Sequence, residues 1–80
     1  MINVYCTFDK ISEEYSIPWF AKNDNVAKRN LKIASQRENL PLEDVKLLRI
    51  GSYCQEDGTL FDTDNAGKVL SAVEVELKFD

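Results

Sequence analysis

The sequence contains no histidine, two cysteines and three glycines, and these shortages exclude several classes of function. Without histidine the chain lacks the commonest general base and metal ligand of proteins. Cys6 and Cys54 are too few to complete a tetrahedral Cys/His zinc site, and we interpret them as reduced thiols. No phosphate-binding glycine loop, nucleophile elbow or zinc-protease motif is present. We therefore expect a protein that is not an enzyme and that binds neither a metal nor a cofactor.

Long hydrophobic runs are also missing. No stretch reaches the roughly 18 consecutive apolar residues that cross a bilayer, and the N-terminus lacks the basic and apolar regions of a signal peptide. We therefore expect a cytoplasmic protein without contact to a membrane. The 80 residues, 44% of them hydrophobic and 30% charged, predict one folded domain over residues 1–80. A chain this short buries only a small core, so we also expect a homodimer.

Strand patterns dominate the chain. Apolar and polar residues alternate over residues 2–8 and again over 72–79, which is typical of half-buried strands. Residues 45–54 are rich in Val, Leu, Ile and Tyr and predict a third strand. Gly51 in its middle indicates a bulge or the close approach of another backbone.

Shorter segments connect these strands. Residues 13–21 are extended and aromatic, and Pro18 predicts an edge strand or a structured loop because proline donates no ladder hydrogen bond. Residues 56–58 predict a hairpin turn that leads into a short returning strand over 59–61. Residues 62–67 predict a polar loop.

One helix is predicted over residues 24–38, begun by Asn23 or Asp24 as the capping residue and ended at Asn39. At 100° per residue its apolar side chains form one broad stripe that should pack on the sheet. The members of this stripe are Val26, Ala27, Leu31, Ile33 and Ala34. The predicted fold class is therefore α+β, a small single domain with a largely antiparallel sheet packed by one helix.

Charge is divided unevenly along the sequence. Residues 15–37 contain five bases and one acid, a local charge of +4 in a chain whose net charge is −4. The bases are candidate contacts to nucleic-acid phosphates, and they are Lys22, Lys28, Arg29, Lys32 and Arg37. An ordinary solvated helix face would show the same pattern. Since the pI of about 4.7 opposes strong nonspecific DNA binding, the patch would have to act locally or be multiplied by oligomerisation.

Three aromatic residues lie close to these bases in the sequence. Tyr15, Trp19 and Phe20 could stack on bases of a single strand. Such a cluster could equally form part of the core or of an interface between proteins. The sequence leaves these three roles open.

Two blocks resemble a known protein family, the small nonstructural proteins of the gokushovirus group of single-stranded-DNA phages. The first block covers residues 5–29 and the second residues 42–60. Their shared elements are an aromatic-Asp pair, Tyr-x-x-Pro-aromatic, Asn-Asp, Ala-x-Arg and Ile-Gly-aromatic. In this sequence the elements are Phe8-Asp9, Tyr15-Ser16-Ile17-Pro18-Trp19, Asn23-Asp24, Ala27-Lys28-Arg29 and Ile50-Gly51-Ser52-Tyr53.

The resemblance implies a nonstructural phage protein in the host bacterial cytoplasm. It implies an accessory factor that binds single-stranded DNA during genome replication or at the switch to single-stranded DNA synthesis. A protein-interaction module that binds a phage or host replication protein, through the acidic C-terminal half, is the alternative. A small structural dimer without a ligand is a third possibility.

Overall fold

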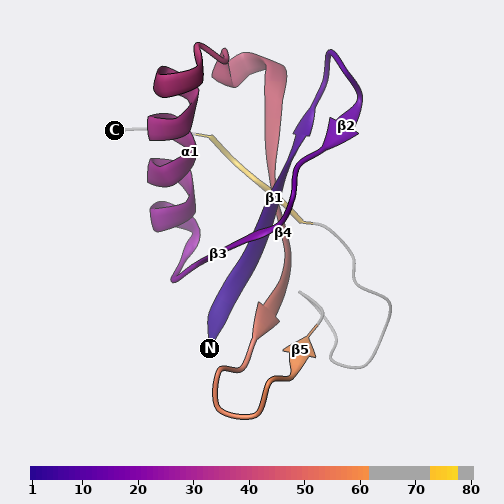
Figure 1. Ribbon diagram of the computed structural model, residues 1–80, viewed down its shortest axis with the longest axis vertical. Coiled ribbons are helices and arrows are strands. Elements are labelled where there is room, and N and C mark those ends of the chain that lie inside the picture. Colours follow the sequence, from indigo (N-terminus) through magenta and orange to yellow (C-terminus); the bar gives the residue numbers. More distant parts are fainter. Residues whose placement is uncertain (62–72, 78–80) are drawn as a thin grey trace.

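The computed structural model describes residues 1–61 and 73–77, which form an antiparallel sheet with one long helix alongside it (Figure 1). This architecture confirms the α+β class. The elements in chain order are β1 Ile2–Asp9, β2 Glu14–Tyr15, β3 Trp19–Ala21, α1 Asp24–Glu38, η1 Leu42–Asp44, β4 Val45–Tyr53, β5 Leu60–Phe61 and β6 Val73–Val75. No helix in the described part of the chain is long and apolar enough to span a membrane.

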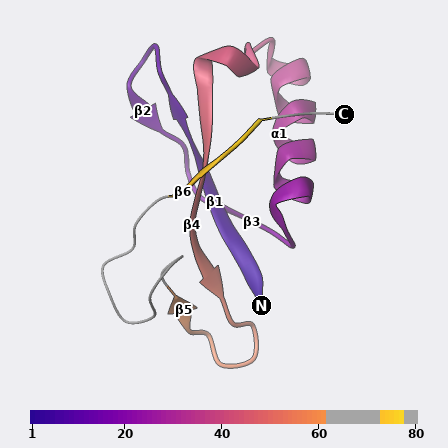
Figure 2. The same ribbon diagram turned by 180° about the vertical axis from the view of Figure 1, so that it is seen from behind.

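The sheet is built around the long antiparallel pair of β1 and β4. β2 and β3 pair with the outer edge of β1, whereas β5 and β6 pair with the outer edge of β4 (Figure 2). The edge strand predicted over 13–21 is therefore present, but it is divided into β2 and β3 on either side of Pro18. The last predicted strand is shorter than expected, because β6 ends at Val75. The loop predicted over 62–67 lies outside the described residues.

A bulge interrupts the pairing of β1 with β4. Val4 pairs with Gly51 and the next residue, Tyr5, pairs with Arg49, so Ile50 is an extra residue in β4. This confirms the bulge that Gly51 predicted. The pairs on both sides of the bulge fix which side chains share a face of the sheet, because paired residues point to the same side.

The helix α1 begins and ends as its sequence predicts. The Val26 amide donates to Asn23 Oδ1 at 2.9 Å, and Asn39 ends the helix in the left-handed conformation with φ 54°. The buried stripe consists of Ala27, Leu31 and Ser35, spaced four residues apart. Ile33 was predicted to lie on this stripe, and that prediction is wrong because its side chain is 47% exposed on the outer side of the helix.

The core lies between α1 and one face of the sheet. Tyr5 and Leu47 are its largest fully buried side chains. The other members of the buried cluster are Ala21, Ala27, Leu31, Val45 and Val75. The alternation of β1 therefore directs Tyr5 towards the helix. Val4 and Cys6, which are also buried, point to the opposite face of the sheet.

Candidate nucleic-acid interface

The charges of α1 are sorted between its two sides. Arg29 and Lys32 are exposed on the outer surface, and Lys28 is half-buried at its margin. Asp24 instead points to the sheet, where its Oδ2 lies 2.7 Å from Arg49 on β4. Glu38 lines a groove of about 320 Å³ between the helix and the β2–β3 segment. The outer surface of α1 is therefore basic, although the chain as a whole is acidic.

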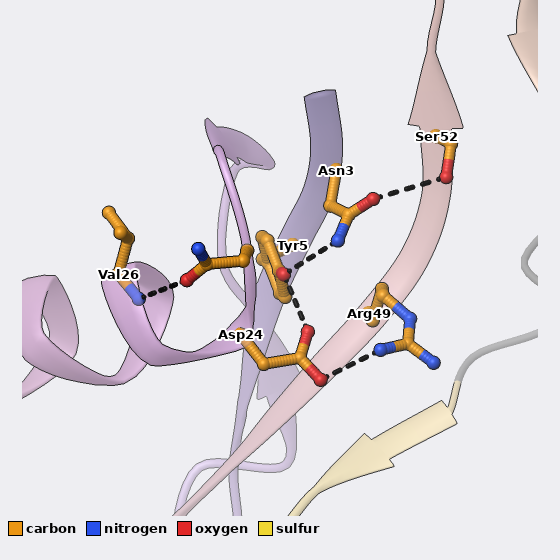
Figure 3. Close-up of polar contacts among 7 residues, drawn as sticks. Asn3, Tyr5, Asp24, Val26, Arg49 and Ser52 are labelled. Carbon is orange, nitrogen blue, oxygen red and sulfur yellow. Dashed lines mark hydrogen bonds and ion pairs between the residues drawn. The ribbon is translucent and has the colours of Figure 1, made fainter. Parts of the chain in front are cut away.

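A chain of hydrogen bonds fixes the first turn of α1 to both central strands (Figure 3). The Tyr5 hydroxyl donates to Asp24 Oδ1 at 2.6 Å, and Arg49 donates to Asp24 Oδ2 at 2.7 Å. Asn3 Nδ2 donates to the Tyr5 hydroxyl at 3.1 Å, and the Ser52 hydroxyl donates to Asn3 Oδ1 at 3.2 Å. A carboxylate in the first turn is also favoured by the helix dipole. This network sets the rotation of α1 and hence which bases face solvent.

The same network shifts two pKa values. Burial and the hydrogen bond to Asp24 raise the pKa of Tyr5 to about 12. Burial alone would raise the pKa of Asp24, but the hydrogen bonds from Tyr5 and Arg49 outweigh it and lower that pKa. Asp24 is therefore held as a carboxylate and Tyr5 as a neutral phenol at neutral pH.

The aromatic candidates do not lie together. Trp19 pairs across β1 with Tyr5 on the helix side, with ring centroids 6.2 Å apart, and packs against the core cluster. Its Nε1 is buried without a hydrogen-bond partner in the described structure. Phe20 and Tyr15 are 52% and 67% exposed and point to the opposite face of the sheet. The two exposed rings are therefore separated from the bases of α1 by the sheet itself.

Three further basic residues lie at or near α1, two exposed bases near its ends and one arginine that forms an ion pair. Lys22 and Arg37 are exposed close to the two ends of α1. Arg29 forms no ion pair with another described residue. Arg49 instead pairs with Asp24, and this role was not predicted from the sequence. The available signal was a charged residue at an inward-facing position of a half-buried strand.

Comparison with known proteins gives one family. The family described as Phage ORF5 protein matches residues 2–75, almost the whole chain. The search of curated proteins found no match. The search of solved structures also found none.

Proposed function

We propose that this chain, which belongs to the Phage ORF5 protein family, binds single-stranded DNA through the outer surface of α1. In this proposal the chain is a non-enzymatic accessory factor of phage genome replication, acting in the host cytoplasm at the switch to single-stranded DNA synthesis. The resemblance to gokushovirus nonstructural proteins supports the replication role. The sorting of charges on α1 is the observation that carries the DNA-binding part.

Three bases would contact phosphates on this surface. Lys28, Arg29 and Lys32 lie within one helical turn of each other, since they are one, three and four residues apart. Of the two acids of the helix, Glu38 lines the groove beside the β2–β3 segment. Asp24 forms its ion pair with Arg49 on β4, and Lys28 is near enough to interact with it electrostatically. Cations grouped in this way attract a phosphate backbone locally even when the net charge of the chain is −4.

The helix surface predicts binding without strong sequence preference. Long basic side chains on a solvent-exposed helix face meet phosphates and not base edges, which carry the sequence information. The exposed Lys22 and Arg37 near the helix ends would extend the contact along the strand. Contacts to three phosphates give a slope of about −2 in a plot of log affinity against log salt concentration.

The experiment is a fluorescence anisotropy titration of labelled single-stranded oligonucleotides at several salt concentrations. The variant K28E/R29E/K32E should lose binding and stay folded, because Arg29 and Lys32 are exposed and Lys28 is only half-buried. R29E and K10E form a matched pair, since each changes the net charge equally and Lys10 lies in the turn after β1. R29E should weaken binding and flatten the salt dependence, whereas K10E should have little effect.

Unchanged binding in the folded triple variant would contradict the proposal. Absence of binding by the wild-type chain would favour the alternative, a module that binds a phage or host replication protein. Unfolding of the triple variant is separated from loss of binding by the single variant R29E, because Arg29 forms no ion pair with another described residue.

A further inference from the structure

The face of the sheet opposite α1 carries three of the exposed large hydrophobic side chains of the described chain, Tyr15, Phe20 and Leu60. Strand pairing arranges its residues in four rows, and we call this surface the open face. The rows are Tyr15, Phe8 and Lys46; Cys6, Leu48 and Glu74; Phe20, Val4 and Gly51; and Ile2, Tyr53 and Leu60. None of the described elements packs on it as α1 packs on the other face.

The open face contains two pairs of neighbouring aromatic rings. Phe8 and Tyr15 have ring centroids 4.8 Å apart, and Phe20 and Tyr53 have centroids 5.5 Å apart. Leu60 beside Tyr53 is 51% exposed. Isolated apolar residues are common on protein surfaces, but several exposed apolar side chains on one face of a sheet are typical of an interaction site.

Two charges of opposite sign lie within this apolar surface. Lys46 is the cross-strand partner of Phe8, and Glu74 is the partner of Leu48. Both side chains are exposed, and neither forms an ion pair with another described residue. Lys46 and Glu74 are diagonal neighbours on the sheet, because Leu48 is the cross-strand partner of Glu74 and lies two residues after Lys46 on β4. The face therefore contains both halves of an ion pair.

We infer that the open face is the interface of a homodimer with two-fold symmetry. A two-fold axis that lies in the interface brings each residue of one copy opposite the residue of the other copy that is placed equally far on the other side of the axis. An axis that passes between Lys46 and Glu74 brings Lys46 of each copy opposite Glu74 of the other. Leu48 of one copy then lies near Leu48 of the other copy, in an apolar centre flanked by two ion pairs.

A second copy fits the open face better than a nucleic acid does. Stacking platforms for single strands combine exposed rings with a surplus of bases along the groove. Among the described residues in its rows, the open face has one base, Lys46, and one acid, Glu74, so these residues offer no net attraction to phosphates. Sheet-to-sheet packing would also leave the basic surface of α1 outside, on both sides of the dimer.

Charge reversal across the axis tests the interface by sedimentation equilibrium. K46E and E74K should each raise the dissociation constant of the dimer by about tenfold or more, because each brings like charges together. The double variant K46E/E74K should restore it, because the ion pairs form again with their signs exchanged. K32E is the matched control, since Lys32 lies on the outer surface of α1, and should leave dimerisation unchanged.

The inference is overturned if the wild-type chain has a monomer mass at high micromolar concentration, or if the double variant dimerises no better than the single ones. The variant Y15S/F20S gives a further readout that does not depend on charge. Both rings are more than half exposed, so the variant should fold and be monomeric. If it sediments like the wild type but loses oligonucleotide binding, the open face binds DNA bases and not a second copy.

Discussion

Substitution of Asp24 tests the network that orients α1. Asp24→Asn keeps the size of the side chain but removes its charge. It also replaces one of the two oxygens that accept separately from Tyr5 and Arg49 by an amide nitrogen, which only donates. A hydrogen bond to a charged group contributes about 1.5–3 kcal/mol. Since the Asp24 side chain is 37% exposed, solvent screening reduces that figure, and we expect a loss of about 1–2 kcal/mol. A domain of this size has a free energy of unfolding of about 4–12 kcal/mol, so the loss is measurable.

Urea unfolding at several pH values measures this loss. The pKa of Asp24 is lowered in the folded chain, so its contribution is present above the ordinary aspartate pKa of about 3.9 and disappears as the pH falls through the folded value. Wild type and Asp24→Asn should therefore differ at neutral pH and converge in acid. Glu14→Gln, at an exposed residue of β2, is the control. Equal stability of wild type and Asp24→Asn at neutral pH would refute the reasoning.

Further perturbations address the core, the helix cap and the buried phenol. Leu47→Ala should lower the free energy of unfolding by about 2–5 kcal/mol in urea titrations, because the residue is fully buried; a loss below about 1 kcal/mol would contradict the described core. Asn23→Ala should cost about 1 kcal/mol through loss of the cap, whereas Asn25→Ala, on the exposed side of the same turn, should cost little. Alkaline unfolding should show that Tyr5 stabilises the fold below pH 10 and loses about 2–3 kcal/mol as the pH rises to about 12. Tyr5→Phe should remove that dependence, and its persistence in this variant would assign the dependence to other groups.

Much of the fold could be predicted from local patterns. Alternation predicted β1, and the content of Val, Leu, Ile and Tyr predicted β4. Gly51 predicted the bulge, and Asn23 and Asn39 predicted the ends of α1. These features depend on residues close together in the sequence, so the sequence contains their signals.

The side of the sheet that α1 covers could not be predicted. Val4 and Cys6 mark one face of β1 as apolar, yet the helix packs on the other face, around Tyr5. Tyrosine is apolar in its ring and polar at its hydroxyl, and the partner that satisfies this hydroxyl, Asp24, is 19 residues away. Pairing over such distances leaves no local pattern.

The candidate site was only partly predictable for the same reason. Periodicity assigned Lys28, Arg29 and Lys32 to the outer side of α1, where Arg29 and Lys32 are exposed but Lys28 is half-buried. The sequence grouped Trp19 with Phe20, but neighbouring residues of a strand point to opposite faces, so the structure separates these two rings.

The most direct test of the central claim is the salt dependence of oligonucleotide binding. Anisotropy titrations of the wild-type chain at increasing salt should give a slope of about −2 in log affinity against log salt, because three phosphates are contacted. The K28E/R29E/K32E variant should show no binding under the same conditions while its circular dichroism stays that of the wild type. Wild-type affinity and slope in this folded variant would show that the outer surface of α1 does not bind DNA.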